Sequence, residues 1–449
     1  MGTNNGNIKI GEKFAYGLGD GANSVVWASV GAFMLYFFTD IAHLSAAVAG
    51  TILLWARVID GFVDILVGTL VDRTQTRFGK ARPWILWMAL PFGLFTIMLF
   101  SVPDFSMTGK IVYYSIAYFA VNIIYSCINI PYGTLNSLIT QDQQERQVLN
   151  IFRMLTALIV SLVVIVGTTG FVKALGNDGG AWQQTFIIYS VIAVFMYFIT
   201  FFGTKERVKI VTNTDTDTQV TTKMRIISML KNENMWIVFA LSITMFLTNG
   251  MSGINIYYCK YIFGDETKMS LLMLASYAPI LLVLPVSALF VKKLGKRNYT
   301  LVGCFISIVG FVIMLMAPEN LNIILIGSLI KGIGMGALMA TIFPMVFDTI
   351  EYGEWKTGIR AEALTYSMSS VASKLGTAGG AAIIAALLSV GGYVAGADTQ
   401  SDSAMLAFKA SFIYIQFALL ILTTVLLFFY KLDKMYPTIM KELEARKNA

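Results

Sequence analysis

Three ionisable residues, Arg57, Asp60 and Asp64, lie inside one apolar stretch at residues 46–71. The stretch is long enough to cross a lipid bilayer, where an ionised side chain costs roughly 2.5–3.5 kcal/mol on insertion scales. Their spacing puts all three on one face of a helix. Two carboxylates one turn apart repel each other until a cation, a shared proton or a basic group neutralises them. The stretch therefore predicts a buried cation site; a static ion-pair network with Arg57 is the alternative.

Other apolar stretches carry polar residues at helical spacing. Amides, hydroxyls, aromatic rings and a few charges are the groups that bind a sugar, because its hydroxyls need paired donors and acceptors and its C–H faces stack on aromatic rings. Each polar side chain taken singly could instead make an ordinary hydrogen bond between helices. The candidates for binding a polar substrate are Asp20, Asn23, Ser24, Trp27, Tyr125, Asn129, Arg153, Tyr366 and Ser370.

The elements that must position these residues are membrane-spanning helices. The 449 residues are 56% hydrophobic and only 13% charged, with a mean hydropathy of +0.70. Such a composition predicts an all-α polytopic membrane protein embedded in a lipid bilayer. We count twelve apolar runs, at residues 14–39, 46–71, 84–102, 111–137, 147–172, 184–203, 235–262, 270–291, 298–317, 322–348, 362–391 and 409–430.

The distribution of positive charge orients these runs. If both termini are cytoplasmic, most of the 33 Lys and Arg residues fall on the cytoplasmic side, as the positive-inside rule requires. The residues left outside are Lys110, Lys173, Lys260, Lys268 and Lys409. The net charge of +7 is thus explained by topology and indicates no nucleic-acid partner. We expect a multi-pass protein of the cell membrane.

The chain divides into two halves of six runs. A polar segment at residues 204–234 separates a half at 1–203 from a half at 235–431, and a tail follows at 432–449. The loops after the second and the eighth run read "VDRTQTRFGKARP" and "VKKLGKRN", both short, basic and built around glycine. Two six-helix halves joined by a polar linker are typical of the major facilitator fold. That fold predicts substrate and cation binding between halves that rock to give alternating access.

The sequence carries few signals of catalysis. It has no Walker motif, no nucleophile–base pair and no metal-ligand cluster, and its single histidine, His43, falls in a short loop. We therefore expect neither an enzyme nor a bound cofactor.

Four stretches resemble one family of transporters. They read "YGLGDGANSV", "YFFTDIAHLSAAVAGTILLWARVIDGFVDILVGTLVDRTQTRFGKARPW", "INIPYGTLNSLITQDQQER" and "DTIEYGEWKTGIRAEALTYSMSSVASKLGTAGG". They are similar to the glycoside–pentoside–hexuronide:cation symporters, and the likeness covers essentially the whole chain. It implies cation-coupled symport of a glycoside. It assigns cation binding to Asp60 and Asp64, with the Ser126 hydroxyl beside them.

The resemblance also assigns roles outside the cation site. It implies that Arg153 binds the sugar, that Tyr125 lies near the sugar, and that Lys374 balances the carboxylate pair. Tyr366 and Ser370 lie on the Lys374 face. We also predict that the loops "DRTQTRFGK" and "EYGEWKTGIR" lie on the cytoplasmic side and gate one conformation through charged contacts of Asp72, Arg77, Glu351, Glu354 and Arg360.

Departures from the family pattern bear on the substrate. Members that carry melibiose have aspartates at the positions of Ser24 and Asn129 and a tryptophan at that of Gly133, so an α-galactoside is not expected. The "NIPYG" and "GDGAN" stretches are more similar to the pentoside and glucuronide carriers. We expect a xyloside, or a hexuronide whose carboxylate could meet Arg153. A lysolipid symporter of the same fold and a sugar sensor that transports nothing remain alternatives.

The coupling ion follows from the ligands at hand. Sodium needs several oxygen ligands, whereas a proton needs one carboxylate of suitable pKa. Asp60, Asp64 and Ser126 supply few oxygens, and Val63 supplies none where melibiose carriers have an asparagine. Two close carboxylates raise each other's proton affinity. We therefore favour H+, with Na+ possible, and expect a monomer.

Overall fold

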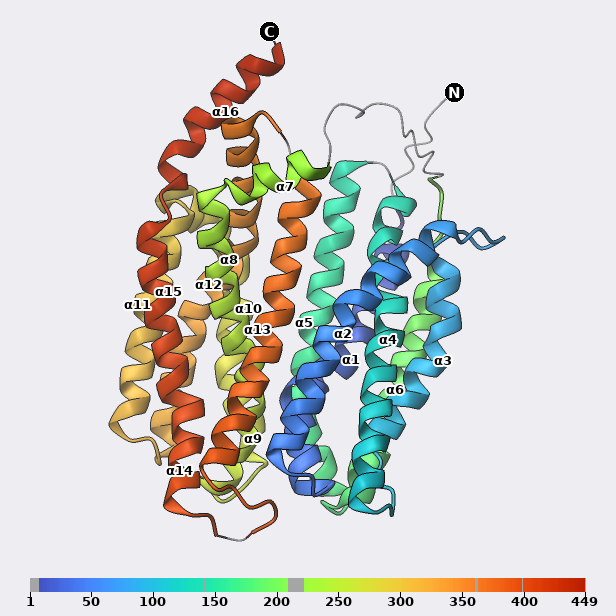
Figure 1. Cartoon of the computed structure of the whole chain (residues 1–449), viewed down its shortest axis with the longest axis vertical. Helices are drawn as coiled ribbons and strands as arrows, with labels where there is room; N and C mark the ends of the chain where they lie inside the picture. Colours follow the sequence, from blue (N-terminus) through green and yellow to red (C-terminus); the bar gives the residue numbers. More distant parts are fainter. Residues whose placement is uncertain (1–7, 141, 209–221, 360–361, 398, 449) are drawn as a thin grey trace. The chain divides into compact units, whose positions relative to one another are not determined.

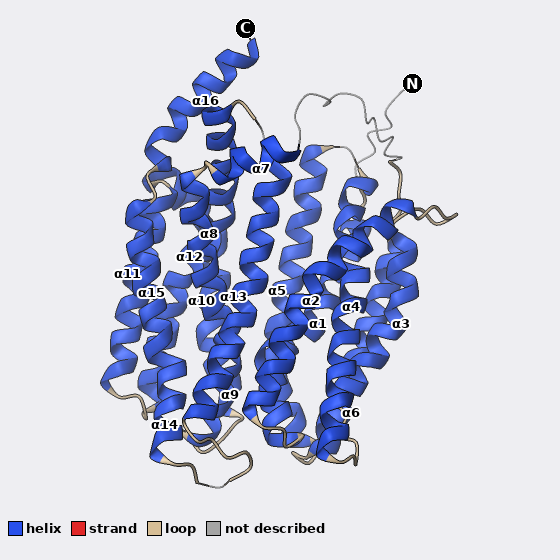
Figure 2. Cartoon of the chain, viewed as in Figure 1, coloured by secondary structure: helices blue, strands red, loops and turns tan. Residues whose placement is uncertain are grey.

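The computed structural model describes residues 8–140, 142–208, 222–359, 362–397 and 399–448; at some positions within helices, among them Arg57, Asp72 and Tyr366, it does not describe the side chain. The described chain is built from helices, and no described residue belongs to a strand (Figure 2). It forms two compact units, Met1–Thr212 with Tyr393–Thr399 and Asn213–Gly392 with Gln400–Ala449 (Figure 1). We call them the N-terminal and the C-terminal unit.

In the N-terminal unit helix α1 packs against α5 and α6, while α4 packs against both α2 and α3. Buried glycines let α1 approach its neighbours: a Cβ at Gly19 would lie 2.4 Å from the Tyr132 ring. The elements are α1 (Ile10–Tyr36), the π-helix η1 (Phe37–Ile41), α2 (Ala46–Arg73), α3 (Arg82–Leu99), α4 (Met107–Ile139), α5 (Gln143–Ala174) and α6 (Gly179–Gly203).

Helix α12 packs against α10 and α11 in the C-terminal unit, and α8 packs against α13 and α15. The elements are α7 (Thr222–Leu230), α8 (Glu233–Gly250), the 3-10 turn η2 (Met251–Gly253), α9 (Ile254–Tyr261), α10 (Lys268–Leu294), α11 (Lys296–Met316), α12 (Leu321–Thr357), α13 (Glu362–Val390), α14 (Asp402–Lys409), the π-helix η3 (Ala410–Tyr414), α15 (Ile415–Phe429) and α16 (Leu432–Asn448).

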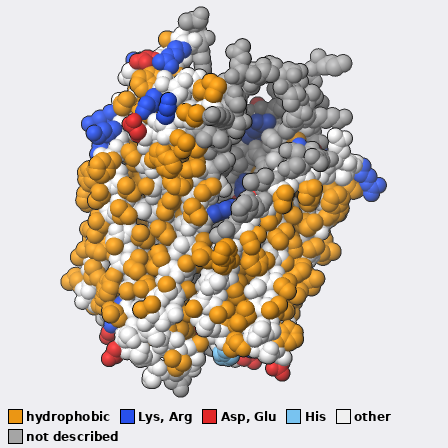
Figure 3. Space-filling view, viewed as in Figure 1, with side chains coloured by type: hydrophobic (Ala, Val, Ile, Leu, Met, Phe, Trp, Pro, Cys, Tyr) orange, Lys and Arg blue, Asp and Glu red, His pale blue; other side chains and the backbone are white. Residues whose placement is uncertain are grey.

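The helices confirm the prediction of a polytopic membrane protein. Among the described residues, eleven helices are long and apolar enough to cross a membrane. The remaining predicted run, residues 46–71, lies in α2, a 28-residue helix; its described apolar start, Ala46–Ala56, counts in this comparison as a shorter apolar helix. The visible surface along the helices of each unit is mostly hydrophobic, with charged side chains gathered near the helix ends (Figure 3).

One segment predicted as a loop is helical. Residues 351–357 of "EYGEWKTGIR" are the last two turns of α12, so Glu351 and Glu354 lie on a helix. Glu, Trp and Lys are compatible with a helix, and α12 ends only at Gly358, whose φ of 72° forms a left-handed cap with its N–H donating to the Glu354 carbonyl. The prediction of a loop over residues 351–357 was wrong.

A charged clasp closes the N-terminal unit at the start of α3. The Glu206 carboxylate, which follows α6, accepts hydrogen bonds from the backbone N–H groups of Lys80, Ala81 and Arg82 at 2.8–2.9 Å. The Arg82 guanidinium donates to the Phe201 carbonyl near the end of α6, at 2.6 Å from Nη2. The carboxylate thus caps one helix N-terminus while the guanidinium caps the C-terminal end of another, both favourable to the helix dipoles.

The C-terminal unit repeats this clasp. The Asp433 carboxylate accepts the backbone N–H of Arg297 at 2.6 Å, and the Arg297 guanidinium donates to the Leu427 and Phe428 carbonyls at the end of α15. The repeat explains the similarity of the two glycine-centred basic loops in the sequence. Gly79 and Gly295 both have positive φ, 111° and 80°, at the two equivalent turns.

Candidate functional site

The first part of the site joins α2 to α4. The Ser126 hydroxyl donates to Asp60 Oδ1 at 2.8 Å, and the Asp60 residue is only 3% exposed. Asp64 lies one turn further along α2 and is half-buried. The structure therefore brings together two of the three residues predicted to bind the cation. A buried carboxylate that accepts a hydroxyl hydrogen bond can hold a cation or a proton. The role of Asp60, Asp64 and Ser126 in coupling stays a prediction.

The second part joins α1 to α5 by an ion pair. Arg153 Nε lies 2.9 Å from Asp20 Oδ2, and their side chains are 29% and 18% exposed. The Arg153 guanidinium also lies 5.1 Å from the centre of the Tyr132 ring on α4. Because Asp20 offsets the charge of Arg153, the pair as a whole is neutral. Such a pair suits the hydroxyls of a neutral ligand, which need a donor and an acceptor side by side.

Two tyrosines that are not among the predicted site residues, Tyr197 and Tyr132, hold this pair in place. Asn23 Nδ2 donates to Asp20 Oδ1 at 3.3 Å, and the Tyr197 hydroxyl on α6 donates to Asn23 Oδ1 at 2.6 Å. Tyr132 donates to the Tyr16 carbonyl at 2.6 Å and stacks on the Tyr16 ring. The chain from Tyr197 to Arg153 therefore links α6, α1 and α5. Tyr197 sits in an apolar run where only its hydroxyl sets it apart from its neighbours.

Aromatic and amide groups complete the part of the site on α1 and α4. The Trp27 and Tyr125 rings meet edge to face with centres 4.7 Å apart. Asn129 lies one turn from Tyr125, and its buried Oδ1 accepts no hydrogen bond within the described structure. Ser24 is half-buried on α1. An orphaned amide oxygen beside an aromatic pair is a ready acceptor for a substrate hydroxyl.

The remaining predicted residues lie elsewhere or outside the described part. Lys374 is half-buried and Ser370 exposed, both on α13 of the C-terminal unit. Arg77 is exposed, with its guanidinium 4.6 Å from the centre of the neighbouring Phe78 ring. The side chains of Arg57, Asp72 and Tyr366, and Arg360 as a whole, lie outside the described residues. The gating role of these residues stays a prediction. The structure also shows the clasp made by Glu206, which the sequence analysis missed.

The fold and the polar interior of its helices define a membrane transporter. The sequence matches the family described as MFS/sugar transport protein over residues 15–434. The chain belongs to this family, and the resemblance to the glycoside–pentoside–hexuronide:cation symporters is confirmed. Because the family and the relatives are membrane transporters, the comparisons also confirm that the chain is not an enzyme.

Similar proteins support both the family and the fold. The chain is 33% identical to the isoprimeverose transporter of Lactiplantibacillus pentosus, over 98% of this chain and 92% of that protein. It is 31% identical to a glucuronide carrier protein homolog of Escherichia coli (strain K12), over 96% and 95%.

Solved structures with lower identity show the fold alone. A proton dependent oligopeptide transporter structure matches with a TM-score of 0.64 at 11% identity, over 97% of this chain and 100% of that one. The nucleoside transporter NupG matches with a TM-score of 0.59 at 14% identity, over 94% and 99%. The major facilitator fold predicted from the sequence is thereby confirmed.

Proposed function

We propose that the protein imports a glycoside across the cell membrane together with a monovalent cation, by alternating access. The observation that carries this proposal is the arrangement of the N-terminal unit, where a buried carboxylate on α2 and a neutral Asp20–Arg153 pair on α1 and α5 lie in one unit. The first suits a cation and the second suits sugar hydroxyls.

The two parts share helix α4, and this suggests how they are coupled. Ser126 contacts Asp60, while the adjacent residue Tyr125 contacts Trp27. A change in the charge of Asp60 therefore acts on α4 at the point where the aromatic pair begins. We propose that loading the cation at Asp60 and Asp64 orders Tyr125 and raises the affinity for sugar, as linkage between two sites requires.

The substrate we favour is a pentoside, such as a xyloside, or a glucuronide. The relatives named as an isoprimeverose transporter and as a glucuronide carrier homolog support this choice. Ser24 and Asn129 place uncharged groups on the face where melibiose carriers have aspartates. Substrate-specific counterflow in proteoliposomes, with a xyloside, a glucuronide and an α-galactoside in parallel, tests the proposal. Counterflow of the α-galactoside alone would contradict it.

The coupling ion we propose is the proton. Asp60 and Asp64 suffice for one shared proton. Transport should respond to an imposed pH gradient at fixed sodium. Strong stimulation by sodium at fixed pH, with no response to the pH gradient, would reject the proton.

The carboxylate pair gives a direct test of coupling. Asp60→Asn or Asp64→Asn should abolish uphill accumulation, because neither variant binds the cation, while exchange of preloaded sugar is less affected. Exchange assays in the same vesicles are the control. Normal accumulation with both aspartates replaced would remove them from the coupling mechanism.

A further inference from the structure

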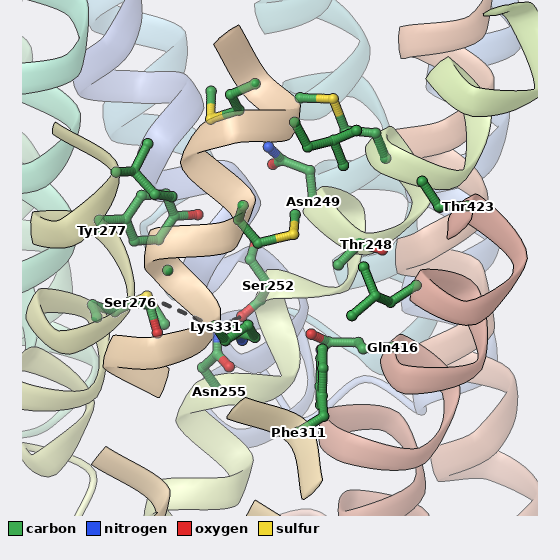
Figure 4. Close-up of a pocket in the computed structure, with 18 residues that line it drawn as sticks. Thr248, Asn249, Ser252, Asn255, Ser276, Tyr277, Phe311, Lys331, Gln416 and Thr423 are labelled. Atoms are coloured by element: carbon green, nitrogen blue, oxygen red, sulfur yellow. Dashed lines mark hydrogen bonds between the residues drawn. The ribbon is translucent and has the colours of Figure 1, made fainter. Parts of the chain in front are cut away.

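The C-terminal unit contains a cavity of about 100 Å³. It lies where the helix broken at η2 passes between α10, α12 and α15, and polar side chains from all four segments line it (Figure 4). They include Asn249, Ser252, Asn255, Tyr277 and Gln416. One water needs about 10–15 Å³ of such space. The cavity therefore has room for a carboxylate and part of a sugar ring, or for several waters.

Lys331 of α12 supplies the only charge among the lining residues, none of which is an acid. In Figure 4 its side chain lies among Ser252, Asn255 and Gln416. Its ammonium lies 5.4 Å and 5.8 Å from the centres of the Phe311 and Phe412 rings. These ring faces stabilise the cation weakly. Within the described residues no carboxylate lies within ion-pair distance of Lys331.

Two other cations in the described helices are neutralised by carboxylates. Arg153 meets Asp20, and Lys296 forms an ion pair with Asp348. Such pairing is the rule, because a buried charge without a counterion is costly. Lys331 departs from that rule in a cavity that also offers amide and hydroxyl groups. This combination favours an anion that brings its own hydrogen-bonding groups.

We propose that the Lys331 cavity binds the carboxylate of an acidic glycoside and so selects hexuronides over neutral glycosides. The proposal rests on the proposed sugar transport and assigns its acid-recognising group. It also revises the expectation that Arg153 meets the carboxylate, because Asp20 already offsets the charge of Arg153. The amides of Asn249 and Asn255 would then hydrogen-bond the hydroxyls next to the carboxylate.

Three ligands that differ at one carbon test the proposal. They are the 4-nitrophenyl β-glycosides of glucuronic acid, glucose and xylose, which present a carboxylate, a hydroxymethyl group and hydrogen at the same position. Binding to purified protein in lipid nanodiscs is measured by calorimetry for the wild type, Lys331→Met, Lys331→Arg and Lys293→Met. Lys293 is an exposed lysine at the end of α10 and serves as the matched control.

We expect the wild type to bind the glucuronide at least tenfold more tightly than the glucoside. Lys331→Met should weaken glucuronide binding by about 10–100-fold, the range of a charge-assisted hydrogen bond, and change xyloside binding less than threefold. Lys331→Arg should keep most of the preference for the acid, and Lys293→Met all of it. Retained xyloside binding also shows that the Lys331→Met protein is folded.

Each contrary result has its own meaning. A wild type that binds glucuronide no better than glucoside overturns the assignment of Lys331 without any variant. Equal losses for glucuronide and xyloside in a folded Lys331→Met protein also overturn it, while xyloside transport leaves the proposed function standing. If the wild type binds and transports none of the three glycosides, the proposed function fails and this inference fails with it.

Discussion

Ser126 makes one hydrogen bond to Asp60, at 2.8 Å in a buried setting. Replacing Ser126 by alanine removes a donor from a carboxylate that must change its charge during transport. A hydrogen bond to a charged group is worth about 1.5–3 kcal/mol, and this one favours the ionised form of Asp60, so Ser126→Ala should raise the apparent affinity for the coupling proton about tenfold or more. The measurement is the cation dependence of transport in proteoliposomes.

A matched change on the same helix controls for the loss of a hydroxyl. Ser137 on α4 donates to the Thr134 carbonyl and contacts no acid. Ser137→Ala should leave the cation dependence unchanged. An equal effect of the two substitutions would mean that Ser126 acts through the stability of α4 and not through Asp60.

Asp20 and Arg153 should behave as a unit. Removing either partner leaves a partly buried charge unpaired, which costs up to about 3 kcal/mol. Asp20→Asn or Arg153→Gln alone should lower the melting temperature and weaken sugar binding. The double variant should recover the melting temperature but not the binding, because both polar groups for the sugar have changed. Thermal melting measures the stability of the three proteins, and calorimetric titration measures their affinity for sugar. Losses of stability that add in the double variant would contradict the pairing.

At the scale of the element, Glu206 acts on a helix end. Its carboxylate accepts three backbone N–H groups at the start of α3. Glu206→Gln keeps the shape but loses the charge, and we expect about 1–2 kcal/mol less stability. Glu444→Gln, at an exposed position of α16, is the control. Thermal melting in detergent measures the difference, and equal melting of the two variants would show that the clasp adds nothing.

Gly79 makes the same clasp possible. Its φ is 111°, and an added Cβ would lie 2.3 Å from the Glu206 carboxyl carbon. Gly79→Ala should therefore lower the melting temperature more than Glu206→Gln, because it strains the backbone and displaces the carboxylate together. In the Glu206→Ala background Gly79→Ala should lower the melting temperature by less, because the added Cβ no longer meets the Glu206 carboxylate. An unchanged loss of melting temperature would leave backbone strain as the sole cause.

Helices proved easier to predict than contacts. Long apolar runs mark the helices because a bilayer demands length and hydrophobicity, and they mark α12 well until residue 348. Beyond that point the run turns polar, as an exposed helix end does, and "EYGEWKT" therefore resembled a loop.

The side chains of the site divide in the same way. Asp60 and Asp64 can be recognised in the sequence because they are charges in an apolar run. Tyr197 does not stand out in this way, because its role depends on its hydrogen bond to Asn23 of α1. Lys331 is also a charge in an apolar run, residues 322–348, but the sequence does not show that its ammonium lies beside aromatic rings and away from any described carboxylate. Hydropathy describes each residue against lipid and says nothing of such pairings.

For the whole molecule, the distribution of Lys and Arg predicts cytoplasmic termini. We would replace Cys127, Cys259 and Cys304 by alanine and introduce single cysteines at Asp104 or Glu444, both exposed. A membrane-impermeant maleimide on intact cells should label Asp104→Cys and spare Glu444→Cys until the cells are opened. The reverse pattern would invert the topology.

The two clasps also limit how early each half of the chain can complete its folding during synthesis. Arg82 and the Phe201 carbonyl that it binds are 119 residues apart, and Arg297 and Leu427 are 130 apart. A ribosome adding about 5–20 residues per second needs roughly 6–24 s between the first pair. Throughout that interval the guanidinium must remain hydrated at the membrane surface. The clasp of each half can therefore form only after the last helix of that half has been synthesised. A chain truncated before Phe201 cannot form the first clasp.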